Sequence, residues 1–226
     1  MTSNGSPPTK IAVFCGASAG NSPIFMESAR ELATHMASLN IQLVYGGGNS
    51  GIMGMLAKTL VSLSGPQSVH GIIPDALVKY ERDPEAGATV KPTGETCTLP
   101  DYEIYGYTEV VSDMHTRKLK MAQAVMKGGP GSGFIALAGG FGTFEELMEM
   151  ATWNQLGIMD KGVVVLNQDG FWDDLFKWVD KSITAGFIKQ TNRGIMLEAR
   201  NAQEAVKLLK EYVPSPGRFK LQWGNE

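Results

Sequence analysis

The chain has 226 residues, of which 43% are hydrophobic and 19% are charged, a composition typical of one globular domain with a sizeable core. Its formal net charge is −3 and its lysines and arginines form no dense run, so the composition argues against a nucleic-acid or membrane-surface partner. The cysteines Cys15 and Cys97 lack metal or redox spacing, and with three scattered histidines we predict no metal site.

Residues 1–9 are polar and rich in Pro, Gly and Ser, and we expect them to form a disordered tail. They lack the charged and apolar regions of a signal peptide, and no apolar stretch of the chain approaches the length that spans a bilayer. We therefore expect a cytoplasmic, reduced protein with one catalytic domain over residues 10–213. Residues 214–226 form a polar C-terminal tail.

Short apolar runs then alternate with helical patterns. The first run, 11–16, predicts a buried strand, and Cys15 within it is expected to pack as a small apolar residue. Ser22 and Pro23 then offer a helix start, with the helix running to about Leu39. The run at 41–45 predicts a second strand, followed by a helix to about Leu63, and 69–74 predicts a third strand.

From about Lys79 to Tyr107 the chain is polar and irregular, which is typical of a lid or a binding loop. A helix is predicted from near Asp113. The remaining strands are predicted at 133–140 (with its glycine turn), 163–167 and 195–199, and the remaining helices at 143–156, 171–184 and 201–212. This alternation predicts an α/β fold: a Rossmann-like, doubly wound parallel sheet with helices on both faces, in a single domain.

Three of the predicted strands end in small or glycine-rich turns, which read CGASAGNS, YGGGNSG and LAGGFGT. Glycine turns that open a helix bind phosphate through backbone amides and the positive helix end. Gly46, Gly48 and Gly51 match the dinucleotide pattern GxGxxG, but tight packing of strand and helix explains them equally well. The acid that a dinucleotide needs at the end of the next strand is missing, since Asp75 comes only after Pro74.

Two charged residues have both a structural and a functional explanation. Thr143 and Glu146 have the spacing of a helix capping box, yet Glu146 also lies only ~5 Å along the axis from a phosphate at the helix start. Arg117 shares a helix face with Met114 and Met121, where a charge is costly unless it is paired or reaches a cleft. It either extends to solvent or binds a phosphate, a carboxylate or vicinal hydroxyls.

Together these segments resemble the LONELY GUY family of cytokinin riboside 5′-monophosphate phosphoribohydrolases, whose motifs are PGGxGTxxE and MHxRK. Here they read AGGFGTFEE at 138–146 and MHTRK at 114–118, separated by one strand. The resemblance extends over about residues 10–190 and includes ATWNQLGI at 151–158. Ala138 replaces the first proline of the motif, and the chain between Gly94 and Met114 is longer than in typical plant members, which leaves the preferred base open.

The resemblance implies hydrolysis of a cytokinin riboside 5′-monophosphate, with AMP as a further substrate, to free base and ribose 5-phosphate. It implies no cofactor and a homodimer or a higher homo-oligomer. A helix at 143–156 that is apolar around most of its circumference also favours an oligomer. The implied catalytic pair is Arg117 and Glu146. The implied substrate and phosphate contacts are Ser18, Gly47, Gly48, Lys118, Gly139, Gly140, Gly142, Thr143 and Thr152.

Two other functions remain open. The chain could be a non-catalytic nucleotide or cofactor carrier on the same fold, which a turnover assay would distinguish from an enzyme. A dinucleotide-dependent oxidoreductase is disfavoured by the missing acid. The family is sometimes labelled lysine decarboxylase, but no lysine of this sequence stands out as an anchor for pyridoxal phosphate.

Overall fold

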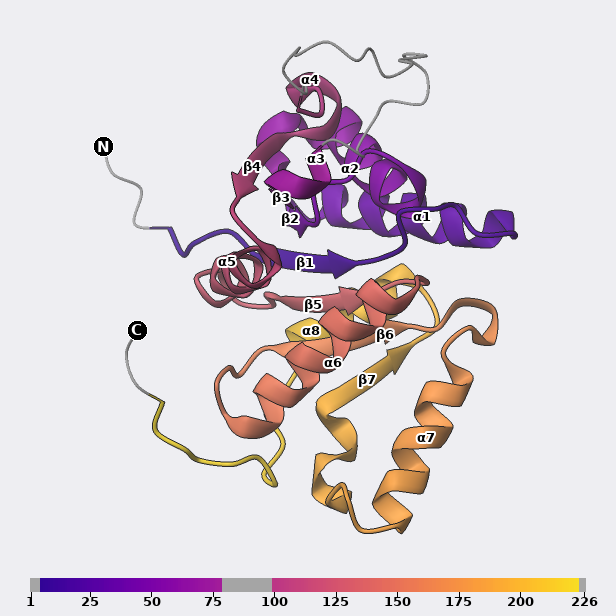
Figure 1. Ribbon diagram of the computed structural model, residues 1–226, viewed down its shortest axis with the longest axis vertical. Helices are drawn as coiled ribbons and strands as arrows, with labels where there is room; N and C mark the ends of the chain where they lie inside the picture. The colour runs from indigo at the N-terminus through magenta and orange to yellow at the C-terminus, as the bar shows by residue number, and fades with distance from the viewer. Residues whose placement is uncertain (1–4, 79–98, 224–226) are drawn as a thin grey trace.

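The computed structural model describes residues 5–78 and 99–223. Within these residues a seven-stranded, all-parallel sheet has the order β4-β3-β2-β1-β5-β6-β7 (Figure 1). The chain builds from β1 outward to β4, then returns to place β5 on the other side of β1 and builds outward to β7. This reversal between β1 and β5 is the switch point at which doubly wound sheets bind their ligands.

The strands are short and mostly apolar, because a parallel sheet is covered on both faces. Their bounds are β1 (Lys10–Phe14), β2 (Gln42–Tyr45), β3 (Val69–Pro74), β4 (Tyr107–Val111), β5 (Gly133–Ala136), β6 (Gly162–Leu166) and β7 (Met196–Ala199). In the register, Val13 pairs with Tyr45 of β2 and with Ile135 of β5. The carboxyl ends of these three central strands therefore lie level, and their loops emerge at one edge of the sheet.

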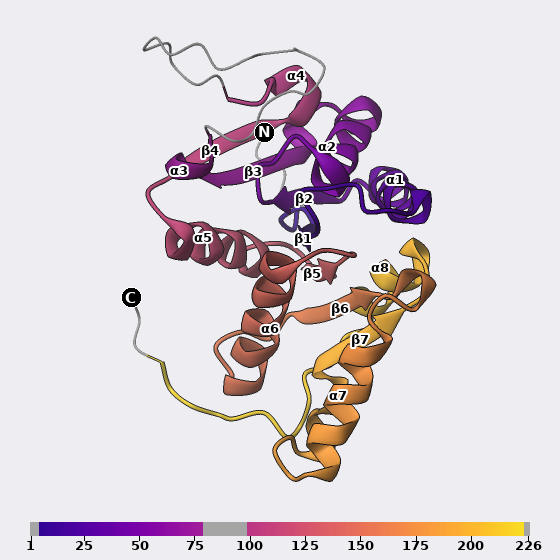
Figure 2. The same cartoon turned by 45° about the vertical axis from the view of Figure 1, so that its right-hand side comes forward.

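Helices cover both faces of the sheet (Figures 1 and 2). One core cluster packs α1 (Pro23–Ser38), α2 (Gly51–Ser64) and α8 (Ala202–Lys210) against one face. The other packs α5 (Met114–Met126), α6 (Phe141–Leu156) and α7 (Asp173–Thr184) against the opposite face. The predicted doubly wound, single-domain α/β fold is confirmed, and so is the burial of Cys15.

Local signals set the starts of two helices. Ser22 caps α1 by accepting from the backbone N–H of Ile24, with Pro23 at the first helical position, as predicted. Asp113 caps α5 by accepting from the N–H of Thr116 at 2.8 Å. This cap places Arg117, the fourth residue of α5, at the end of the first helical turn.

The prediction of an irregular segment up to Tyr107 was wrong at its C-terminal end. Residues 79–98 lie outside the described part of the chain, but α4 (Tyr102–Tyr105) is a short helix and β4 begins at Tyr107. The sequence pattern missed β4 because it is an edge strand. Tyr107 is 54% exposed and Val110 is 41% exposed, so β4 lacks the continuous apolar run that marks a buried parallel strand.

The segments near the two termini lie against helix ends. Pro8 O accepts from the N–H of Gly129 at 2.9 Å, in the turn that follows α5. Residues 215–223 pass the C-terminal end of α6, which both views show (Figures 1 and 2). None of the helices in the described residues is long and apolar enough to cross a membrane.

Candidate active site

The loops after β1, β2 and β5 meet at the carboxyl edge of the sheet. Gly16 N donates to Ala138 O at 3.0 Å, which joins the β1 loop to the β5 loop. Ser50 Oγ donates to Ala17 O at 3.1 Å, which joins the β2 loop to the β1 loop. The three turns that the sequence singled out therefore form one continuous surface at the switch point.

Arg117 from α5 and Glu146 from α6 form an ion pair on the same side of the sheet. Arg117 Nη2 lies 2.9 Å from Glu146 Oε1, and the two side chains are only 11% and 7% exposed. Arg117 therefore does not extend to solvent, which removes the structural explanation that the sequence left open for it. Nε of Arg117 has no hydrogen-bond partner within the described residues, so this buried pair retains a free donor.

Gly46 provides the space that Arg117 occupies. A Cβ at position 46 would lie 2.2 Å from Arg117 Nη2. Gly47 and Gly51 have φ angles of +78° and +57°, which L side chains rarely adopt. Packing and backbone conformation thus account for these three glycines, two of which, Gly46 and Gly51, belong to the GxGxxG pattern. Gly47 and Gly48, expected to contact substrate, are buried.

The glycines of the β5 loop differ from those of the β2 loop. At Gly140 and at Gly142 an added Cβ would meet no atom of the described residues within 4 Å, and neither residue has a positive φ. Both are exposed, so packing does not explain why they are glycines. A ligand pressed against the backbone amides would explain it. Gly139, in contrast, is required by packing, because its Cβ would lie 2.1 Å from Thr143 Oγ1.

The capping box expected for Thr143 and Glu146 does not form. Helix α6 begins two residues earlier, at Phe141, and its N-cap is Gly140. Thr143 is therefore the third residue of the helix and Glu146 the sixth, whereas a capping box needs Thr at the N-cap and Glu at the third position. Capping thus does not explain Glu146. Gly142 precedes it by four residues, on the same face of α6.

Two opposing influences act on the charge of Glu146. Burial raises the pKa of this carboxyl above its usual value, and the nearby Arg117 guanidinium counteracts part of that rise. Cys15, the residue after β1, is buried near Glu146 and Arg117, and the charges of both side chains affect its pKa. Burial raises the pKa of the Cys15 thiol and the negative charge of Glu146 adds to the effect, so this thiol stays neutral.

Lys118 follows Arg117 in sequence but points to different partners. It forms ion pairs with Glu145 and Glu149 of α6, the latter with Nζ 3.2 Å from Oε2. Burial tends to lower the pKa of Lys118, but the hydrogen bonds from its ammonium to these two carboxylates raise it above its usual value. Sequence reasoning missed this pairing, whose only signal was the i, i+4 spacing of two acids on α6.

The remaining predicted contacts lie at different distances from the pair. Ser18 is exposed on the β1 loop, which belongs to the glycine surface. Thr152 is exposed too, but it is six residues beyond Glu146 on α6. That spacing is ~9 Å along the helix axis and about 120° around it. One copy of the chain therefore does not bring Thr152 to the Arg117–Glu146 pair.

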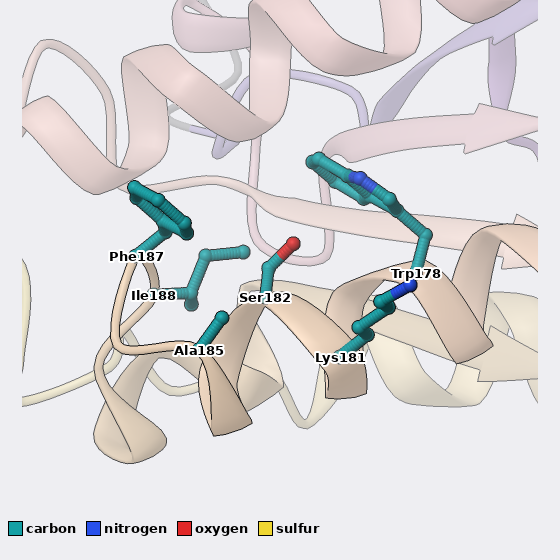
Figure 3. Close-up of a pocket in the computed structure, with 6 residues that line it drawn as sticks. All are labelled: Trp178, Lys181, Ser182, Ala185, Phe187 and Ile188. Atoms are coloured by element: carbon teal, nitrogen blue, oxygen red, sulfur yellow. The ribbon is translucent and has the colours of Figure 1, made fainter.

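A cavity of about 370 Å³ lies away from this site, on α7 and the turn after it. Figure 3 shows the side chains that line it, with Trp178 and Phe187 facing each other across it and Ser182 between them. It is mainly apolar and includes none of the predicted site residues, so it does not suit a sugar phosphate. No group of three or more metal-binding side chains was found among residues 5–78 and 99–223.

Comparisons with known sequences found a matching family model and several similar proteins. The family described as "Possible lysine decarboxylase" matches residues 53–209. LOG1 of Arabidopsis thaliana, a cytokinin riboside 5′-monophosphate phosphoribohydrolase, is 42% identical over 91% of this chain and 84% of its own length. A bifunctional cytokinin biosynthesis protein of Fusarium pseudograminearum (strain CS3096) is 46% identical over 96% of this chain, which spans only 43% of that protein.

Comparisons with solved structures reveal the same fold. The molybdenum cofactor binding protein of Rippkaea orientalis superimposes with a TM-score of 0.60 over 90% of this chain and 96% of its own. The Moco carrier protein of Chlamydomonas reinhardtii does so with a TM-score of 0.59 over 90% and 96%. Their identities to this chain are 18% and 19%, so these likenesses establish the architecture alone.

Proposed function

Because this chain belongs to the LONELY GUY (LOG) family of cytokinin riboside 5′-monophosphate phosphoribohydrolases, we propose that it hydrolyses the bond between an N6-substituted adenine and ribose 5′-monophosphate. The products are the free base and ribose 5-phosphate. The observation that carries the proposal is the buried ion pair, at 2.9 Å, between Arg117 of α5 and Glu146 of α6, the helix whose start holds two glycines that packing does not require.

The 5′-phosphate would bind at the amino end of α6. The first backbone N–H groups of a helix have no partner within it, and the helix dipole makes this end positive. Without side chains at Gly140 and Gly142, a phosphate can approach these amides closely. Binding energy from this remote phosphate would fix the ribose for reaction, which raises the rate as well as the affinity.

Glu146 would act on the ribose. Cleavage of an N-glycosidic bond develops positive charge on the sugar ring, as in glycoside hydrolysis, and a carboxylate facing that ring stabilises the charge or orients the attacking water. The ion pair with Arg117 supports a role for the guanidinium in keeping this buried carboxyl ionised. The 11% of the Arg117 side chain that stays exposed supports a second role for the guanidinium, donation to a substrate hydroxyl.

The test is to incubate the protein separately with isopentenyladenosine monophosphate and AMP, and to measure free base and ribose 5-phosphate. We expect release from the prenylated nucleotide and propose AMP as a further substrate. The matching ribosides are the control, and we expect negligible cleavage because they lack the phosphate that α6 would hold. Equal rates on riboside and monophosphate would contradict the phosphate site.

A carrier would bind the monophosphate without releasing base, so the same assay separates the two functions. A lysine decarboxylase needs a lysine amine that can form a Schiff base with pyridoxal phosphate. Lys118, the lysine beside the pair, is held as an ammonium by Glu145 and Glu149. The residues present at this site therefore do not fit pyridoxal phosphate.

We also propose that the active protein is a homodimer or higher homo-oligomer in the cytoplasm. Phe141 is 97% exposed and Phe144 is 43% exposed on α6, so one copy leaves aromatic surface of this helix uncovered. A second copy would bury it and would offer the exposed Thr152 a route to a neighbouring site. Cell fractionation tests the location, and a membrane-bound or secreted protein would contradict it.

A further inference from the structure

We infer that the C-terminal segment 215–223 positions α6, and that Arg218 is a positioning residue for the Arg117–Glu146 site. The kinetic part of this inference rests on the proposed function, whereas its structural part does not. The sequence suggested only a polar tail for this segment. In the structure, hydrogen bonds instead join it to α6, the helix that carries Glu146 and whose start holds Gly140 and Gly142.

The carbonyls at the C-terminal end of a helix have no partners within it. At the end of α6, three of these carbonyls accept hydrogen bonds from segment 215–223. The bonds are Arg218 Nε to Asn154 O at 2.6 Å, Phe219 N to Gln155 O at 2.8 Å and Trp223 Nε1 to Leu156 O at 3.2 Å. Arg218 also donates to Met159 O, beyond the helix, so one guanidinium joins α6 to the chain that leaves it.

The helix end is shaped to admit this segment. Gly157, the C-cap of α6, has a φ of +78° in the left-handed region, where glycine ends helices without strain. A Cβ at this position would also lie 2.4 Å from Phe219 O. Gly157 thus both ends α6 and leaves space for the segment. The positive charge of Arg218 at this end complements the helix dipole, whose positive end is the proposed phosphate site.

Asn154 links the segment to the buried face of α6. Its side chain is fully buried and donates to Lys161 O and to Tyr212 Oη, each at 2.8 Å, while its backbone O accepts from Arg218. These bonds restrain α6 both along its axis and in rotation. Asn154 lies on the same buried side of the helix as Glu146.

The segment has an independent anchor of its own. Ser215 Oγ hydrogen bonds to Asn192 Oδ1 at 2.9 Å, and the ammonium of Lys189 lies 5.7 Å from the centre of the Phe219 ring. These partners belong to the segment around η4 (Gln190–Ile195), which precedes β7. Segment 215–223 therefore bridges η4 and the end of α6. Since a displacement of about 1 Å at a reacting group can lower a rate about 100-fold, this bridge matters for Glu146.

The test compares Arg218→Gln with Lys220→Gln. The second variant also removes one positive charge, but from an exposed side chain two residues further along the chain. The first readout is amide hydrogen exchange over residues 144–150 of α6, and the second is kcat and KM at a temperature well below unfolding. We expect Arg218→Gln to speed exchange there and to lower kcat by about tenfold, with a smaller change in KM. Lys220→Gln should match the unmodified protein, and Arg218→Lys should recover part of the loss.

A truncation after Pro214 should give the same result in stronger form. The inference is overturned if Arg218→Gln speeds exchange only near residues 154–161, lowers the melting temperature and leaves kcat unchanged, because the segment would then serve stability alone. If the unmodified protein releases no base from any nucleotide, the proposed function fails. Faster exchange at 144–150 would still support the positioning role in that case.

Discussion

At the scale of single residues, the charge state of Glu146 is decided by burial and one partner. A carboxyl with only 7% of its side chain exposed loses most of the hydration that favours ionisation. The guanidinium of Arg117, 2.9 Å away, restores part of that stabilisation. Such a pair is costly to break from one side, since about 3–5 kcal/mol is lost when one buried partner is removed. Conservative substitutions are therefore the informative ones.

Glu146→Gln should lower turnover by about 100-fold or more while leaving folding and nucleotide binding largely intact, because the amide keeps the shape but cannot carry the negative charge. Single-turnover kinetics and thermal unfolding would separate the two effects. Glu211→Gln, at an exposed position on the opposite side of the sheet, is the control and should change neither. A Gln variant with near-normal turnover would exclude Glu146 from the chemistry.

The pH dependence of kcat/KM should reflect the raised pKa of Glu146. If the ionised carboxylate is the active form, activity falls as pH drops through a pKa above the usual glutamate value. Lys118 lowers the pKa of Glu146, whereas Glu145 and Glu149 raise it. Lys118→Met removes the first influence and unmasks the other two, so the acid limb should move to higher pH.

Lys120→Met is the matched control for that profile. Lys120 pairs with Glu109 on β4 and is not among the groups that shift the pKa of Glu146. Its acid limb should therefore coincide with that of the unmodified protein. If the acid limb of the pH profile lies at the same pH in Lys118→Met and in the unmodified protein, a group other than Glu146 controls it.

At the scale of elements, the two ends of α6 have different surroundings and different proposed roles. Its amino end, as in any α-helix, has backbone N–H groups without partners inside the helix, and it lies beside Gly140 and Gly142. Its carboxyl end is closed by segment 215–223. Between them, the buried face of the helix carries Glu146 against α5. The proposed phosphate site and the proposed catalytic carboxylate thus lie on one rigid element, which keeps the distance between them constant.

Gly142→Ala should weaken substrate binding without weakening the fold. The added methyl group meets no protein atom within 4 Å, and alanine is favoured over glycine in a helix by up to about 1 kcal/mol. It would, however, occupy the space proposed for the phosphate, so KM should rise about tenfold. Gly194→Ala, which also meets nothing within 4 Å, is the control. An unchanged KM in Gly142→Ala would place the phosphate elsewhere.

At the scale of the whole molecule, the α5–α6–α7 face leaves aromatic surface uncovered. Trp153 of α6 packs partly against the core of its own chain. Phe141 and Phe144 are the side chains that one copy does not cover. Other helices of the same chain therefore do not bury these two side chains.

Phe144→Glu should therefore weaken self-association, because a charge would be buried at the proposed contact. Light scattering at micromolar concentration should give the mass of at least a dimer for the unmodified protein and a smaller mass for the variant. Leu63→Glu, on α2 at the opposite layer and 55% exposed, should leave the mass unchanged. A monomer mass for the unmodified protein would contradict the proposed oligomer.

The sequence by itself determined the alternation of elements and the two motifs, and through them it singled out Arg117 and Glu146, the proposed catalytic pair. These are local properties, since hydrophobic period, helix caps and short motifs are written within a few residues of one another. It could not separate the glycines that packing requires from those that it does not. That distinction depends on which atoms lie near each Cβ, as Gly46 beside Arg117 and the open Gly142 illustrate.

The tertiary structure alone decided the remaining points. The 2.9 Å contact of Arg117 with Glu146 requires α5 and α6 to pack on the same face of the sheet, although the two residues are 29 positions apart in the chain. Three further contacts are likewise long-range: the ion pairs of Lys118 with two acids of α6, the pairing of edge strand β4 with β3, and the hydrogen bonds of Arg218 to the end of α6. Contacts of this kind leave no periodic trace in the sequence, because each joins segments whose local patterns are independent of one another.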